Sequence, residues 1–187
     1  RTAVVGHRRG GTLVPRLCAR DGSLAGGAML AEPARPLVEL IPEQMRYLLS
    51  LDGEISDGDE RRLASVEETI TRIRNGTLDA GERPFGLGGP AYWQELQAYD
   101  QVATAGDLDR PLYFLQGERD YQVSVERDFG RWQETTPGRF DAYPSLNHLF
   151  VSGEGQSTPN EYFRPSNVAE GVTTDLADWV RGETGGY

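Results

Sequence analysis

Short apolar runs alternate with amphipathic stretches in the first and last parts of the chain. Four runs have the length and composition of buried strands: residues 2–6, 25–31, 110–117 and 138–144. The run "AGGAMLA" at 25–31 is small and apolar throughout, which favours a sheet covered on both faces. Helical spacing follows the first run at 10–20 and the third run at Val125, Phe129 and Trp132. This alternation predicts a mostly parallel α/β sheet with flanking helices.

The middle of the chain has helical character. Apolar residues recur at helical spacing in two series, Ile41, Met45, Leu48 and Leu49, and then Leu63, Val66, Ile70 and Ile73. Asn75-Gly76 predicts the end of the second helix, and the glycine- and proline-rich stretch 81–93 predicts a loop. We therefore expect an α/β core at 1–32 and 108–187, interrupted by an inserted helical lid at 33–107.

Two helix details can be checked against a structure. The last helix is expected to start near Asn167, with Glu170 as the third residue of a capping box. Its predicted buried side consists of Val168, Val172, Leu176, Trp179 and Val180. Pro15 lies inside the helix expected at 10–20 and weakens it unless it falls near the first turns, because an interior proline costs about 3 kcal/mol.

Composition narrows the classes of partner. The 19 basic residues are all arginine, and 29 acidic residues bring the net charge to -10, which argues against nucleic-acid binding. A lysine-free acidic chain resembles the proteins of salt-loving archaea, whose acidic surfaces stay soluble at high salt; the alternatives are codon bias or simple solubility. One cysteine, Cys18, excludes an internal disulfide and favours a reducing, cytoplasmic compartment. No apolar run approaches the length of a membrane span.

The stretch "AVVGHRRGGT", from Ala3 to Thr12, has the outline of a strand that breaks sharply into a helix. Gly6 and Gly10 stand where a nucleophile elbow, G-x-S-x-G, has its small residues, and Arg8 stands at the nucleophile position. A phosphate loop has the same glycine spacing but requires a lysine, which this chain lacks. An ordinary strand–helix turn remains the alternative.

Two further residues carry candidate chemistry. Asp120 follows the strand at 110–117, at the edge of a parallel sheet where α/β proteins bind ligands. Taken alone, it is better interpreted as a turn residue that caps the next helix. His148 lies in a loop between Leu146 and Leu149-Phe150, an apolar setting that suits a partly buried imidazole. A lone loop histidine is otherwise usually a surface residue.

Elbow, acid and histidine occur in the chain order of the α/β-hydrolase triad. The sequence resembles the C-terminal part of an α/β-hydrolase, in particular the dienelactone-hydrolase-like and acyl-hydrolase-like enzymes. The stretches "VVGHRRGGT", "PLYFLQGERDYQV" and "YPSLNHLF" resemble the elbow, acid strand and histidine loop of that family. The resemblance extends over nearly the whole chain, and the helical insertion lies where the family places its lid.

The resemblance implies an ester or thioester hydrolase without cofactor or metal. His148 would be the general base, Asp120 would orient its ring, and the backbone N–H of Arg9 would be one oxyanion donor. The chain departs from the family at Arg8, because a guanidinium cannot attack a carbonyl.

The departure leaves three accounts open. In one, the chain is an altered hydrolase that has lost its activity. In another, it is a non-catalytic module that binds a small carboxylate ligand through Arg8. The third is a structural or interaction role for the acidic surface. Only about the second half of the family's sheet is present, so the strand at 2–6 is expected to form an exposed edge that can pair with another chain.

Overall fold

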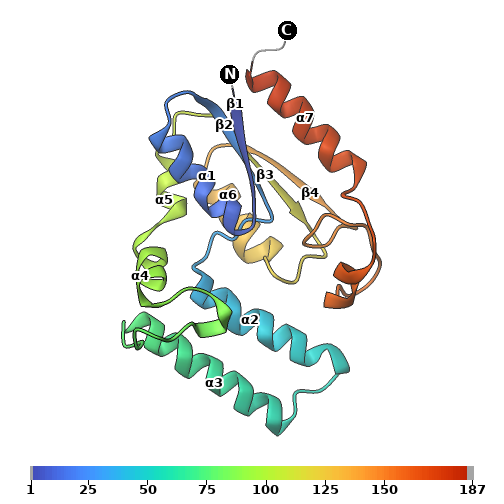
Figure 1. Cartoon of the computed structure of the whole chain (residues 1–187). Coiled ribbons are helices and arrows are strands. Elements are labelled where there is room, and N and C mark those ends of the chain that lie inside the picture. Colours follow the sequence, from blue (N-terminus) through green and yellow to red (C-terminus); the bar gives the residue numbers. More distant parts are fainter. Residues whose placement is uncertain (1, 185–187) are drawn as a thin grey trace. The chain divides into compact units, whose positions relative to one another are not determined.

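The structure, a computed structural model, describes residues 2–184 (Figure 1). It divides into two compact units. The first unit consists of two segments of the chain, one up to Ala34 and one from Gln101 onward. The second unit is the segment between them, Arg35–Asp100. The short helix α5 (Gln101–Gly106), which the lid prediction at 33–107 included, therefore lies in the first unit with the sheet.

The first unit contains a four-stranded sheet whose neighbouring strands are all parallel. Its strands are β1 (Thr2–His7), β2 (Leu24–Leu30), β3 (Leu112–Gly117) and β4 (Arg139–Tyr143). Their spatial order is their order in the chain, with Met29 paired to Phe114 and Phe114 paired to Phe140. The prediction of a parallel α/β fold is confirmed. Strand β1 is one edge of this sheet, and Val5 on it is 46% exposed.

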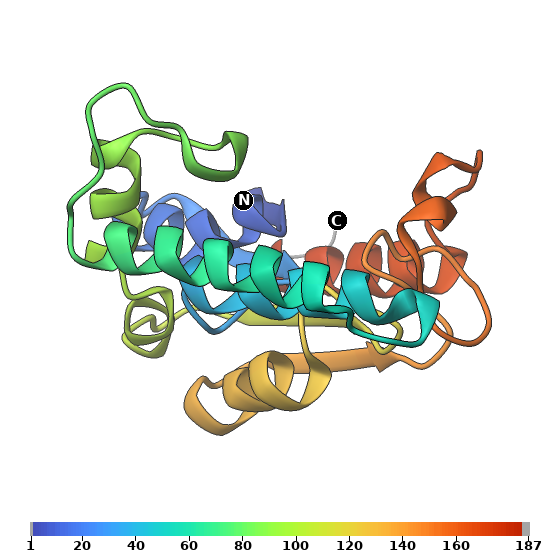
Figure 2. The same cartoon turned by 90° about the horizontal axis from the view of Figure 1, so that it is seen from below.

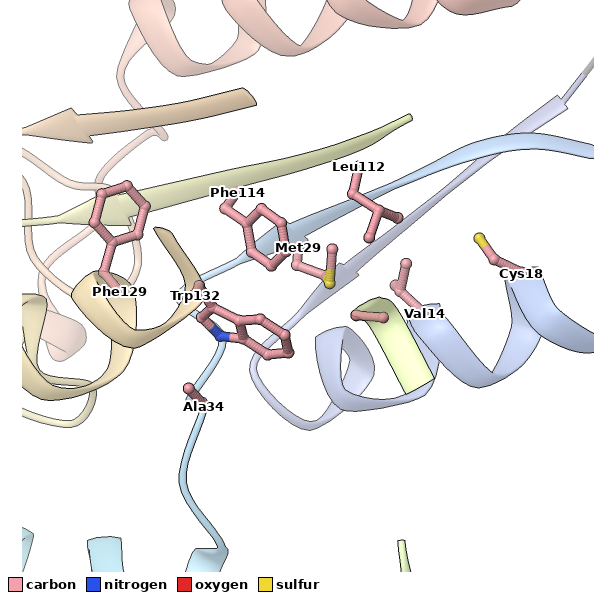
Figure 3. Packing of buried hydrophobic residues seen from close by; sticks show 9 residues of the cluster. Val14, Cys18, Met29, Ala34, Leu112, Phe114, Phe129 and Trp132 are labelled. Atoms are coloured by element: carbon pink, nitrogen blue, oxygen red, sulfur yellow. The ribbon is translucent and has the colours of Figure 1, made fainter. Parts of the chain in front are cut away.

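Helices cover both faces of the sheet (Figures 1 and 2). In this unit they are α1 (Arg9–Arg20), α5, the π-helical turn Val125–Phe129, α6 (Gly130–Thr135), the 3-10 helix Pro159–Phe163 and α7 (Glu170–Thr184). Met29 and Phe114 point to one face, where Trp132 and Val14 pack on them (Figure 3). Neighbouring strand residues point to the other face, where α7 packs with Trp179. The sheet is thus the middle layer of three.

The glycine pair in β2 allows this close packing. A Cβ on Gly27 would collide with Val14 and press on Cys18 of α1, whereas a Cβ on Gly26 would collide with the backbone of Pro111. The small residues at 25–31 therefore let helix and strand approach closely, in a sheet covered on both faces as their composition indicated.

The second unit is helical. It consists of α2 (Leu37–Leu49), the 3-10 turn Ser50–Asp52, α3 (Asp57–Arg74), the 3-10 turn Pro84–Gly86 and α4 (Pro90–Ala98). Its core contains Val38, Val66, Ile70, Ile73 and Trp93. A reciprocal capping box between Ser56 and Asp59 starts α3, and Gly76, with φ of 66°, follows its end.

Two local predictions need correction. The stretch 81–93 is not loop to its end, because Pro90 occupies the first turn of α4, where its missing N–H costs nothing. Helix α7 begins at Glu170 rather than near Asn167, and Val168 is 45% exposed instead of buried. Pro15 lies inside α1, where the sequence placed it; it is buried and has no backbone N–H to donate to the helix.

Within residues 2–184, no helix is long and apolar enough to cross a membrane.

Candidate active site

The turn between β1 and α1 has the geometry of an elbow. Arg8 has φ of 50° and ψ of -123°, a conformation that residues with a side chain rarely adopt. Its N–H donates to the Leu30 carbonyl, and its own carbonyl accepts from Thr12 at 3.1 Å. A Cβ on Gly6 would collide with the backbone of Gly10, so strand and helix meet where only glycine fits. Gly10 itself faces open space.

Backbone strain gathers at the same edge of the sheet. Of the four non-glycine residues with positive φ in the described chain, Arg8 follows β1, Ala31 follows β2 and Phe150 lies in the loop after β4. Such strain costs on the order of 1–3 kcal/mol per residue and tends to occur at functional sites. The strain thus singles out the carboxyl ends of the strands.

Asp120 and His148 come together at this edge. Nδ1 of His148 lies 2.7 Å from Oδ2 of Asp120, and both residues are buried. The Asp120 carboxylate also accepts from the backbone N–H of Gln122 at 2.7 Å, from that of Val123 at 3.1 Å and from the Gln116 amide at 3.0 Å. A carboxylate surrounded by donors is an acceptor, so His148 donates from Nδ1.

The second ring nitrogen of His148, Nε2, is available to accept a proton. Because Nδ1 carries the proton, Nε2 of a neutral ring holds a free lone pair. Nε2 is buried and has no hydrogen-bond partner among residues 2–184. A buried acceptor without a partner is costly in an ordinary protein interior, and a general base needs such an acceptor.

His7 connects the elbow to this pair. His7, next to Arg8, donates from Nε2 to the His148 carbonyl at 2.9 Å, and the two rings are 4.8 Å apart. Burial lowers the pKa of His7, and the hydrogen bond to His148 partly opposes this. Burial raises the pKa of Tyr121, next to Asp120, while the charge of Arg8 acts in the opposite direction. The charge of Arg8 also lowers the pKa of His7.

A buried carboxyl lies behind the elbow. Glu32, just after β2, is 3% exposed, and its Oε1 accepts from the Thr12 hydroxyl of α1 at 2.8 Å. Its Oε2 has no partner in the described chain. Burial raises the pKa of Glu32 well above its usual value, and the nearby charge of Asp128 adds to this.

The structure therefore brings Asp120 and His148 together, and the contact of His7 with the His148 carbonyl joins the elbow to this pair. Leu146 and Phe150 bury the histidine loop, whereas Leu149 is partly exposed. Arg9 is the first residue of α1, at the positive end of the helix dipole. Sequence reasoning missed Glu32 and His7, since neither stands in a pattern that reveals burial or a contact with a distant loop. Among residues 2–184, no group of three side chains is arranged to hold a metal ion.

The arrangement is that of an acid–base pair beside a strained turn. It can take a proton from a nucleophile, but the elbow side chain is a guanidinium. A guanidinium can bind an anion with two parallel N–H groups and cannot attack a carbonyl.

No model of a known protein family matches the chain. Esterase EstD from Thermotoga maritima is 38% identical over 189 residues, which cover 96% of this chain and 42% of EstD. The esterase domain of a Rhodothermus marinus protein superposes with a TM-score of 0.54 at 18% identity, over 97% of this chain and 60% of that one. A lipase-esterase related protein from Clostridium acetobutylicum superposes with a TM-score of 0.52 at 14% identity, over 94% of this chain and 65% of that one.

The chain thus spans less than half the length of EstD and about three-fifths of the two solved proteins. Over the shared part, its four parallel strands and flanking helices have the α/β-hydrolase-like fold of these esterases.

Proposed function

We propose that this chain carries the acid–base half of an ester-hydrolase site with the nucleophile replaced. The observation that carries the proposal is the buried Asp120–His148 pair with a free Nε2, beside an elbow whose backbone is strained at Arg8. The 38% identity to EstD supports the reaction class. The glycine pattern around the elbow favours the dienelactone-hydrolase-like subtype, which is part of the proposal.

The chemistry follows from the geometry once a serine replaces Arg8. The serine oxygen would attack the ester carbonyl while Nε2 of His148 takes its proton, and Asp120 would stabilise the resulting imidazolium. The backbone N–H of Arg9 would donate to the carbonyl oxygen as it becomes negative. His148 would return the proton to the departing alkoxide, and water would then release the acid in the same way. With Arg8 in place, no acyl-enzyme forms.

A fluorophosphonate probe, which bonds covalently to an activated serine, tests this assignment. We expect the unmodified chain to remain unlabelled, Arg8→Ser to be labelled, and Arg8→Ser combined with His148→Ala to lose the label. Turnover of p-nitrophenyl esters by Arg8→Ser is expected to be weak, since one missing oxyanion donor costs about 100- to 1000-fold. Esterase activity of the unmodified chain that survives His148→Ala would contradict the proposal.

A second function is favoured by the surroundings of Arg8. Arg8 is partly buried, and its side chain forms no ion pair with a carboxylate among residues 2–184, although 29 acidic residues are present in the chain. A small carboxylate ligand, fatty or aromatic, would supply the missing anion with two parallel hydrogen bonds.

Titration calorimetry with octanoate and 4-phenylbutyrate separates the two functions. If Arg8 binds the carboxylate, Arg8→Ser weakens binding about tenfold or more, the effect of losing a hydrogen bond to a charged group. Arg20→Ser, which removes an equal charge at the far end of α1, is the control and should change binding little. Absence of binding to the unmodified chain excludes this second function.

Three further assignments belong to the same proposal. The helical unit Arg35–Asp100 is proposed as the lid of the site. The exposed edge of β1 is proposed to pair with another polypeptide, because Val5 and an unpaired strand edge face outward. The acidic, lysine-free composition is proposed to reflect a high-salt, cytoplasmic setting.

A further inference from the structure

Beyond Asp120 and His148, one carboxylate connects the two loops that carry them. Glu161 lies in the 3-10 helix Pro159–Phe163, outside both motifs. Its Oε1 accepts from Nη2 of Arg119 at 2.7 Å, and its Oε2 accepts from Nη1 at 3.2 Å. The same Oε2 accepts from the Asn147 amide at 2.8 Å. Arg119 immediately precedes Asp120, and Asn147 immediately precedes His148.

Each partner of Glu161 is fixed by further contacts. Arg119 donates from Nε to the Gly155 carbonyl at 2.9 Å and from Nη2 to the Glu154 carbonyl at 3.0 Å. A Cβ on Gly153 would collide with the Arg119 guanidinium, so the loop after His148 wraps closely around this side chain. Arg119 is only 9% exposed, and its charge is therefore held inside the protein.

Asn147 fixes the histidine loop from the other side. It is 1% exposed, and its Oδ1 accepts from the backbone N–H groups of Leu149 at 3.0 Å and Val151 at 3.2 Å. Its backbone N–H donates to the Val151 carbonyl. The amide oxygen of Asn147 thus holds the turn that carries His148, while the amide nitrogen of the same side chain donates to Glu161.

We propose that Glu161 is the positioning residue of the acid–histidine pair. One anion holds the residue before the acid and the residue before the histidine, so it sets the separation between Asp120 and His148. Together, these charge-assisted hydrogen bonds lower the pKa of Glu161 despite its partial burial, so the carboxylate remains charged. The inference rests on the proposed acid–base role of Asp120 and His148.

The test is Glu161→Gln, read out on the His148 ring. Glutamine has the same shape, but its amide nitrogen would face a donor of either Arg119 or Asn147, so one of the two contacts is lost. The readout is the downfield ring N–H proton in NMR spectra of histidine-labelled protein. The chain has two histidines, and His7→Gln identifies their signals.

We expect the Nδ1–H proton of His148 to exchange with water about tenfold faster in Glu161→Gln, or its signal to disappear, as loss of one hydrogen bond to a charged group predicts. Crystal structures provide the second measurement. The distance from Nδ1 of His148 to Oδ2 of Asp120 is expected to exceed hydrogen-bond range in the variant.

Glu82→Gln is a matched control. Glu82 also accepts two hydrogen bonds from one arginine, Arg72, and one from the backbone N–H three residues earlier, that of Asp79. It lies in the other unit of the chain. Its loss should weaken a similar ion pair and leave the His148 signal unchanged. An equal change of that signal in both variants, or no change in Glu161→Gln, would overturn the proposal.

A second pair of variants applies even if Glu161→Gln folds poorly. Asn147→Asp keeps the acceptors for Leu149 and Val151 but places a carboxylate against Glu161, and it should free the His148 proton as well. Combining Asn147→Asp with Glu161→Gln restores a donor–acceptor pair in reverse and is expected to restore the His148 signal. Without that rescue, a positioning role for Glu161 is excluded. If Arg8→Ser is not labelled by the fluorophosphonate probe, that result counts against the proposed function. The measurements of the His148 ring proton still test the role of Glu161.

Discussion

The ring nitrogen Nδ1 of His148 lies 2.7 Å from Oδ2 of Asp120, although the two residues are 28 positions apart and stand in different loops. The pair is buried, and the carboxylate is surrounded by donors. Because the acid fixes the proton on Nδ1, the opposite nitrogen is the reactive one.

Asp120→Asn should reverse this arrangement. The asparagine amide can donate to Nδ1 of His148, so the ring proton is expected to move to Nε2. The free energy of unfolding should fall by about 1–3 kcal/mol, because buried donors lose an ionised acceptor. Nitrogen-15 NMR measures which ring nitrogen of His148 carries the proton, and urea unfolding measures the stability. The exposed Asp178→Asn is the control, and a ring that keeps its Nδ1 proton would contradict the expectation.

Gly6→Ala should be far more harmful than Gly10→Ala. A methyl group at position 6 would collide with the Gly10 backbone, whereas position 10 faces open space inside α1. We expect Gly6→Ala to cost about 3 kcal/mol through overpacking. Gly10→Ala should be neutral or stabilising by about 0.5–1 kcal/mol, because alanine favours the helix. Thermal and urea unfolding of both variants measure this, and equal losses would show that the strand–helix contact is not tight.

Arg8→Gly is expected to stabilise the fold. Arg8 has φ of 50° and ψ of -123°, which glycine adopts without steric cost. Relief of this strain should raise the free energy of unfolding by about 1 kcal/mol, after allowance for the more flexible unfolded chain. Arg9→Gly, one residue into α1, should instead lower it. If both variants are destabilised, Arg8 makes contacts that outweigh its strain.

Glu32 should make stability fall as the pH rises. Burial raises its pKa in the folded state above the usual value of 4.5, so the native protein holds a proton that the unfolded chain releases. Its contribution is complete below about pH 4.5 and decreases as the pH rises through the folded-state pKa. Glu32→Gln, which cannot ionise, should remove this loss. Urea unfolding between pH 4 and 9 tests this, and parallel curves for the two proteins would contradict it.

Salt should stabilise this chain. At a net charge of -10, its acidic groups repel one another in dilute buffer, and molar KCl screens that repulsion. The melting temperature is expected to rise steadily from low to molar KCl. A flat or falling midpoint would leave codon bias or simple solubility as the explanation of the lysine-free composition.

The local pattern of apolar residues was sufficient to predict where the strands and most of the helices lie. Short, continuous apolar runs and series of helical period each determine which residues of an element can be buried, and β2 and α3 follow them closely. The small residues of β2 also indicated a sheet covered on both faces, which Gly26 and Gly27 explain through close contact. The order of elbow, acid and histidine was sufficient to select Asp120 and His148 for inspection.

The tertiary structure decided what no local pattern contains. Helix α4 begins within a stretch rich in glycine and proline, because Pro90 needs no helical donor at the first turn. Whether Glu32 is charged depends on the burial that packing gives it. The link from Glu161 to Arg119 and Asn147 joins three segments whose spacing carries no signal, since hydrogen bonds between distant loops are set by folding. The sequence by itself thus determined which residues could do chemistry, while the fold determined which of them meet.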